Sequence, residues 1–152
     1  MRPIERLLDQ LNRAYGGEAW HGLALRQLLE DVTEEEARAH PIAGTHSIAE
    51  LVAHIRATMD MVSERLAGTP RELTTEEDWS DATRTSWPAA LEELDNAESR
   101  VSDAVARLTP EDLDRLVAGK DYTVYVMIHG VIQHNLYHAG QIALLKKTLA
   151  TR

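Results

Sequence analysis

Several side-chain types are missing from the sequence or scarce in it. The 152 residues include no cysteine and no phenylalanine, and aromatic residues make up only 5%. Without cysteine the chain can form no disulfide and offers no thiolate nucleophile, so any metal ion must be held by histidine and carboxylate side chains. The scarcity of aromatic residues also leaves few surfaces on which the bases of single-stranded nucleic acid can stack.

Basic residues are outnumbered by acidic ones. The chain has 16 Lys and Arg against 25 Asp and Glu, which gives a formal net charge of −9. Binding to the phosphates of nucleic acid depends on clustered Lys and Arg, and here the basic residues are scattered. We therefore expect no nucleic-acid partner.

Long apolar segments are absent as well. No run approaches the roughly 20 apolar residues of a membrane span. The N-terminal stretch MRPIERLLDQ lacks the apolar core and the small-residue cleavage site of a secretion signal. These absences predict a cytoplasmic protein with no membrane partner.

Helical periodicity organises the chain, and no stretch shows the alternation of a half-buried strand. The length predicts a single domain over residues 1–152. Capping-box sequences that start at Thr33 and Ser47 indicate helix starts, and Thr109-Pro-Glu-Asp112 is expected to open a short helical turn. The polar, acidic stretch 69–85 is expected to be a surface loop. The four long helices are expected over 3–30 with a break at Gly16-Gly17, over 47–67, over 86–108 and over 123–149. One apolar stripe on each predicts an all-α bundle, with antiparallel neighbours as the default arrangement.

The sequence does have histidine, with seven in all. His134 and His138 are four residues apart in the last helix, so their imidazoles lie on one face about one turn apart. At about 100° per residue, both fall in the apolar stripe of that helix, and His54 falls in the stripe of the second long helix. Three imidazoles with further open positions describe a catalytic metal site, because a closed structural zinc site uses four protein ligands.

Core histidines can also exist without a metal. Each ring nitrogen then needs a hydrogen-bond partner, and few polar side chains are available near these helix faces. Glu50 is explained by the capping box that starts at Ser47, or it orients a metal-binding histidine. Gln141 lies about 20° from the direction of His134 and would reach the same site. Glu50 and Gln141 are the candidates for a catalytic role, although neither is identified as a general base.

The remaining histidines are less informative. His129 points about 140° away from His134, which predicts a surface or interhelical position. His40 precedes a proline and is expected in a loop. His21 and His46 are each placed where they could approach one end of the bundle, so their roles stay open.

Several catalytic signatures are missing. A di-iron carboxylate bundle needs two Glu-x-x-His motifs, and Glu18-x-x-His21 is the only match. The HExxH helix of zinc proteases and the G-x-S-x-G turn of serine hydrolases are both absent.

Four stretches together resemble the DinB/YfiT-like family of small metal-binding four-helix proteins. They are AWHG at 19–22, HSIAELVAHI at 46–55, the Trp-Pro start of the third long helix, and DYTVYVMIHGVIQHNLYHAGQIALLKK at 121–147. The resemblance covers the chain from about residue 4 to residue 149. It implies an up-down-down-up bundle with one long crossover, and it implies that His54, His134 and His138 are the metal ligands.

The resemblance also implies a range of activities. Members are frequently homodimers, and relatives are linked to low-molecular-weight thiols, as in bacillithiol- or mycothiol-dependent S-transfer and isomerisation, or to metal-dependent hydrolysis. The leading hypothesis is thus a metal-dependent transferase or hydrolase of a small-molecule substrate, with zinc or nickel, or else iron, as the ion. One alternative is a non-catalytic metal-binding bundle with a stress-related interaction role. The other is a metal-free dimeric bundle with core histidines.

Overall fold

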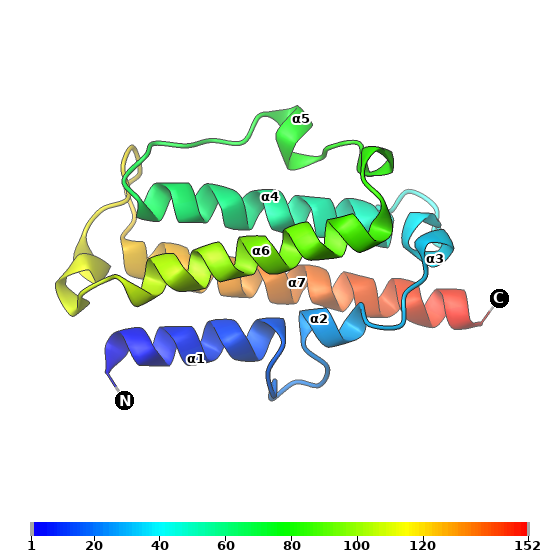
Figure 1. The fold of residues 1–152 in the computed structure, drawn as a ribbon, viewed down its shortest axis with the longest axis horizontal. Helices are drawn as coiled ribbons and strands as arrows, with labels where there is room; N and C mark the ends of the chain where they lie inside the picture. Colours follow the sequence, from blue (N-terminus) through cyan, green and yellow to red (C-terminus); the bar gives the residue numbers. More distant parts are fainter. Residues whose placement is uncertain (1, 152) are drawn as a thin grey trace.

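The structure is a computed structural model that describes residues 2–151 (Figure 1). Helices account for its regular structure, and the strand-like feature found in residues 2–151 is an isolated bridge between Leu116 and Thr123. The all-α prediction is therefore confirmed. The long helices are α1 (Pro3–Tyr15), α4 (Ile48–Leu66), α6 (Trp87–Ala106) and α7 (Val124–Ala150). The short elements are α2 (Leu25–Leu28), α3 (Glu34–Arg38), α5 (Thr75–Asp78), and the 3₁₀ turns η1 (Ala82–Arg84) and η2 (Pro110–Asp114).

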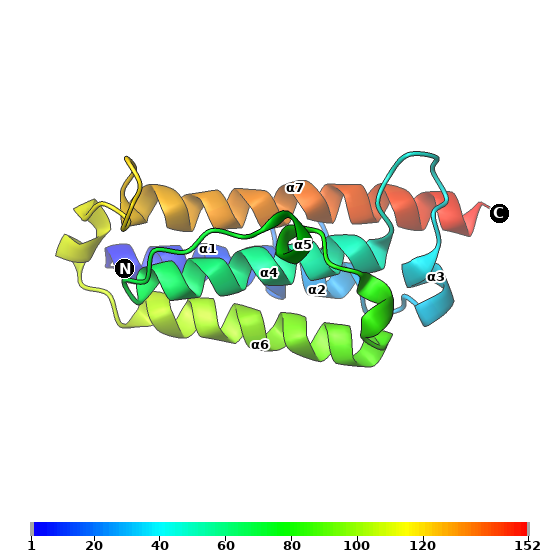
Figure 2. The same cartoon turned by 90° about the horizontal axis from the view of Figure 1, so that it is seen from above.

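The four long helices have up-down-down-up connectivity. In Figure 1, α1 and α7 run in one direction, whereas α4 and α6 run in the other. Because α4 and α6 are consecutive and parallel, the chain must return along the bundle between them, and residues 67–86 make this crossover (Figure 2). The resemblance correctly implied this topology. The default expectation of antiparallel neighbours is wrong for the α4–α6 pair.

Capping residues set the starts of the helices that position the site. The hydroxyl of Ser47 accepts a hydrogen bond from the Glu50 N–H at 3.2 Å, and the Glu50 carboxylate accepts one from the Ser47 N–H at 2.8 Å. Thr33 and Glu36 form the same reciprocal pair at the start of α3. Each pair satisfies two amide groups that the first turn of a helix leaves without partners. Both predicted capping boxes are confirmed.

The predicted break in the first helical segment is also present. α1 ends at Tyr15, and helical structure resumes at Leu25. The amides of Gly16 and Gly17 both donate to the Asn12 carbonyl oxygen, which turns the chain away from the helix axis. A Cβ atom on Gly17 would lie 3.1 Å from the Asn12 main-chain oxygen and 3.3 Å from the Arg13 Cα, closer than ordinary van der Waals contact, so this turn favours glycine.

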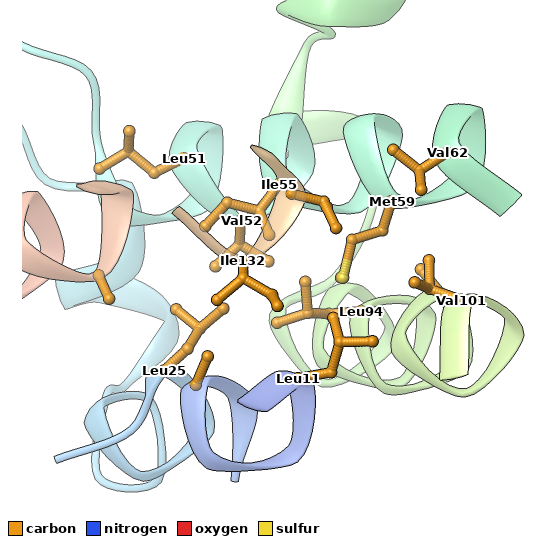
Figure 3. Close-up of a cluster of buried hydrophobic side chains, with 14 of the residues drawn as sticks. Leu11, Leu25, Leu51, Val52, Ile55, Met59, Val62, Leu94, Val101 and Ile132 are labelled. Carbon is orange, nitrogen blue, oxygen red and sulfur yellow. The ribbon is translucent and has the colours of Figure 1, made fainter. Parts of the chain in front are cut away.

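The core lies between the four long helices. Figure 3 shows side chains from α1, α4, α6 and α7 meeting there, joined by Leu25 of α2. α4 packs against both α6 and α7. This packing buries one side of each helix and so determines how α4 and α7 are rotated about their axes. Buried side chains labelled in the figure include Leu11, Leu51, Val52, Ile55, Met59, Leu94, Val101 and Ile132.

The stretch 69–85, predicted to be a surface loop, does connect α4 to α6 outside the four-helix core, but it also contains the short elements α5 and η1.

Among residues 2–151, no helix combines the length and the apolar character that crossing a membrane requires.

Candidate metal centre

Three histidine side chains meet between α4 and α7. One ring nitrogen from each of His54, His134 and His138 can be chosen so that all three nitrogens lie within 4.8 Å of one another. The ring centroids are 4.5 to 4.8 Å apart. His54 and His138 are buried, and His134 is partly exposed. The three residues singled out from helical phase therefore do come together.

Hydrogen bonds hold two of the rings by their Nδ1 atoms. The His54 Nδ1 lies 3.0 Å from the main-chain oxygen of Asp78 and 3.0 Å from its carboxylate. The His138 Nδ1 lies 2.6 Å from the Gln141 side-chain oxygen. Since these oxygens can only accept, each Nδ1 carries the proton in the neutral ring, and each Nε2 keeps its lone pair. Oxygen partners of this kind orient metal-binding histidines in proteins.

The third ring completes the group through its Nε2 atom. The His134 Nε2 lies 2.9 Å from the His54 Nε2, and its Nδ1 lies 3.5 Å from the Asn135 side-chain oxygen. Because the His54 Nε2 has no proton, the His134 Nε2–H donates this hydrogen bond when no metal is bound. A cation would take the place of that proton, and the His134 proton would then move to Nδ1, which faces Asn135.

The surroundings of His134 and His138 favour the neutral form of these two rings. Burial lowers the pKa of His134 to about 4, and the neighbouring rings of His138 and His54 add to this effect. Burial also lowers the pKa of His138, although the hydrogen bond to Gln141 opposes it. Neutral imidazole is the form that binds metal ions, so both rings are in the ligand form at neutral pH.

The crossover contributes a wall to the site. Trp79 stacks on His54 with ring centroids 4.1 Å apart and planes 4° from parallel, and its other face stacks on His46 at 3.6 Å. Figure 2 shows the crossover passing over α4 toward α7 at the level of α5. Asp78 and Trp79 thus fix one ligand ring from outside the bundle. Neither residue can be assigned to the site from the sequence, because the stretch 69–85 has little periodicity and indicates only a loop.

Glu50 belongs to a separate cluster at the start of α4. Besides capping Ser47, its carboxylate lies 3.3 Å from ring nitrogens of His40 and His46. Burial raises the pKa of the Glu50 carboxyl, but hydrogen bonds from the Ser47 amide and from the two histidines outweigh it, so the pKa is lowered. Within residues 2–151, the Glu50 carboxylate contacts Ser47, His40 and His46, which agrees with its interpretation as a capping residue.

The other histidines lie outside the three-histidine group. His21 is exposed, and the His129 ring contacts Tyr125 with centroids 4.5 Å apart. The His46 ring stacks on Trp79, whose indole also stacks on His54. His40 is exposed beside Glu50. The expectation that His129 points away from His134 agrees with these contacts.

The donor set suits a divalent cation. Three imidazole nitrogens without thiolate or carboxylate are typical ligands of zinc, nickel or iron. Three protein ligands also leave coordination positions for a substrate, which separates such a site from a closed structural one. The three-histidine group is therefore able to hold a metal ion.

Comparisons with known proteins agree with this description. A family model described as the DinB superfamily matches residues 19–142, a range that includes all three histidines. The fold is similar to that of a solved structure described as the conserved protein of locus from Enterococcus faecalis, with a TM-score of 0.77. That chain is 16% identical, and the match covers 100% of this chain and 99% of the other. This identity shows a common fold only. None of the curated proteins matches the sequence.

The buried histidines predict that the metal-free protein loses stability in mild acid. His134 has a folded-state pKa of about 4 against 6.5 in an unfolded chain. A depressed histidine pKa contributes stability that is present above pH 6.5 and is lost as pH falls toward 4, because protonation favours the unfolded state. Urea denaturation of chelator-treated protein at a series of pH values should show the unfolding midpoint falling across this range.

The variant His134→Gln provides the control. It removes the titrating ring, so its unfolding midpoint should depend less on pH between 6.5 and 4. The pKa of the Glu77 carboxyl is lowered from 4.5 to about 2, so its stabilising effect is lost mainly below pH 4.5. Carboxylates of this kind therefore contribute little to a change in midpoint between pH 6.5 and pH 4.5. A wild-type midpoint that stays constant from pH 7 to pH 4.5 would contradict the assignment.

Proposed function

The chain belongs to the DinB superfamily, and from this premise we propose that His54, His134 and His138 hold a divalent metal ion in an enzyme that acts on a small molecule. The observation that carries the proposal is the convergence of three imidazoles, two of them held through Nδ1 by oxygen acceptors. Zinc and nickel are the ions we favour, followed by iron, because all three accept imidazole ligands.

Side chains around the three histidines have distinct roles in this proposal. Asp78 and Gln141 keep the Nε2 atoms of His54 and His138 directed at a common point. Trp79 covers one face of His54 and keeps water from that side of the ring. Gln141 is then a positioning residue, since an uncharged amide cannot take up a proton as a base does. Glu50 has its partners at the start of α4.

The chemistry we propose is the activation of a low-molecular-weight thiol. A divalent ion held by three imidazoles is a Lewis acid that lowers the pKa of a thiol or of water. The protein has no cysteine, so a thiol substrate cannot be diverted into a mixed disulfide with the chain. S-transfer to a small electrophile is therefore the leading reaction class, and hydrolysis by activated water is the second. A homodimer in the cytoplasm remains the expected form.

One observation favours a second candidate, a metal-free bundle with core histidines. Within residues 2–151, each fully buried side-chain nitrogen and oxygen has a hydrogen-bond partner, and partners are present for both nitrogens of His54 and for the Nδ1 of His138. The His54–His134 hydrogen bond satisfies two of the three nitrogens that a metal ion would otherwise bind. The two candidates differ in their response to chelators, because only the metal-binding protein loses stability when the ion is removed.

Metal content separates these candidates. Protein purified without chelator should contain close to one equivalent of a divalent metal by elemental mass spectrometry, and His134→Ala should lose it. Removing one of three ligands leaves two imidazoles, which form a weak site. The matched control is His129→Ala on the same helix, which should keep the metal. Equal metal content in the wild type and in His134→Ala would contradict the proposed ligands.

Turnover tests the proposed chemistry. The metal-loaded protein should accelerate the transfer of bacillithiol or mycothiol to 1-chloro-2,4-dinitrobenzene, followed by absorbance, and His138→Ala should show only the uncatalysed rate. His129→Ala should retain the wild-type rate. Activity on p-nitrophenyl acetate without thiol would instead indicate the hydrolase. Metal-loaded protein inactive in both assays would count against an enzymatic role for the site.

A further inference from the structure

A pocket opens beside the three-histidine group, between α4 and α7. Its volume is about 320 Å³, and His134 is the member of the group that lines it. Thr58 lies at the end of the pocket nearest His134 along α4, and Arg65 lies seven residues further along that helix. The partly exposed edge of the metal site thus continues into a defined cavity.

The walls of this pocket are mostly apolar. Side chains from both helices form these walls. In the part of the chain that the structure describes, no Asp or Glu lines the pocket, although acidic residues outnumber basic ones in the sequence. In that lining Arg65 is the one residue with a permanent charge. The apolar lining residues are Met61, Val62, Val126, Met127 and Val131. A ligand that fits is apolar along its length.

The far end of the pocket offers hydrogen-bond donors. Arg65 is buried, with a side-chain exposure of 6%, and donates to the Arg71 main-chain oxygen, to the Tyr122 hydroxyl and to Glu72. These bonds use three of the five N–H groups of the guanidinium, and one N–H remains on each terminal nitrogen. The Tyr122 oxygen accepts from Arg65, so its own proton is available to a further acceptor. An anionic oxygen would receive donors from both side chains.

The dimensions limit the size of the ligand. At 1.5 Å per helical residue, the seven residues from Thr58 to Arg65 span about 10 Å. An extended chain of about eight atoms has this length. Gly130 widens the pocket on the α7 side, because a Cβ atom built there meets no other atom within 4 Å.

We propose that this pocket binds a small amphipathic monoanion, with its anionic end at Arg65 and Tyr122 and its apolar chain between Met61 and Met127. The opposite end of the ligand reaches His134, and in the complete site it carries the group that meets the metal ion. That last element rests on the proposed function, whereas the anion-binding end and the apolar walls do not. The substrate class is thus a small carboxylic acid with an extended apolar chain.

Binding of octanoate to the full-length, chelator-treated protein tests the pocket without relying on a metal. Isothermal titration calorimetry should show octanoate binding at least about tenfold more tightly than octan-1-ol, because the alcohol lacks the two carboxylate oxygens that accept the remaining Arg65 N–H groups and the Tyr122 proton. Tyr122→Phe should weaken octanoate binding and leave octan-1-ol binding unchanged. Equal affinity for octanoate and octan-1-ol would overturn the anionic end of the proposal.

Two glycines on α7 supply a matched pair of variants. Gly130→Leu places a side chain in the pocket and should weaken octanoate binding at least about tenfold, since the ligand then meets an occupied volume. Gly140→Leu is the control, because Gly140 is exposed on the same helix and a Cβ atom there also meets open space. Both replacements improve helix propensity, so both variants should fold.

The results of these experiments distinguish a failure of the pocket proposal from a failure of the metal proposal. If octanoate binds with the expected dependence on Gly130 while no metal is found, the pocket stands and the metal proposal fails. If the metal is present but octanoate does not bind, or binds Gly130→Leu as tightly as the wild type, the pocket proposal fails alone. In a nuclear magnetic resonance titration with octanoate, the amide signals of Gly130 and Met127 should shift. Shifts confined to helices other than α4 and α7 would contradict binding in this pocket.

Discussion

The site depends on the need of buried imidazole nitrogens for partners. Three rings share a small volume between α4 and α7, and leaving any of their six nitrogens without a partner inside the protein would cost free energy. Asp78 and Gln141 satisfy one nitrogen each on His54 and His138. These two contacts determine which tautomer each ring adopts. The Nε2 atoms of His54 and His134 then face each other, the His134 Nδ1 faces Asn135, and one nitrogen from each of the three rings lies close enough to the others to share a divalent ion.

The topology of the bundle makes these contacts possible. Because α4 and α6 run parallel, a connection must travel back along the bundle, and it passes over the side of α4 that faces α7. In a bundle with antiparallel neighbours, a short turn at one end would connect the same helices. The long crossover instead carries Asp78 and Trp79 to His54, with the indole ring stacked between two imidazoles. The crossover therefore contributes to the site as well as connecting two helices.

Much of the fold and the three histidines could be predicted from the sequence, because local rules govern them. Helix starts follow from short-range caps such as Ser47 with Glu50, and the four-residue spacing of His134 and His138 fixes their common face. The parallel pairing of α4 with α6 came from family resemblance, since periodicity alone says nothing about helix direction. Asp78 and Trp79 could not be found, because a polar segment without periodicity gives no indication of which helix it contacts.

The pocket beside His134 could not be predicted from the sequence either. Arg65 and Tyr122 are 57 residues apart, and their hydrogen bond exists only because α4 ends where α7 begins. Likewise, a glycine such as Gly130 indicates open space only once its neighbours are known. Residues of this kind depend on tertiary contacts, whereas caps and helical phase depend on neighbours in the chain.

X-ray absorption spectroscopy at the metal edge of the protein tests the central claim most directly. If zinc is the ion, the account predicts scattering from three imidazole nitrogens at roughly 2.0–2.1 Å, with lighter atoms completing the shell. The same measurement on a nickel- or iron-containing sample should again give three imidazoles. A first shell made mainly of oxygen atoms, with one imidazole or none, would contradict the claim that these three histidines form the metal centre.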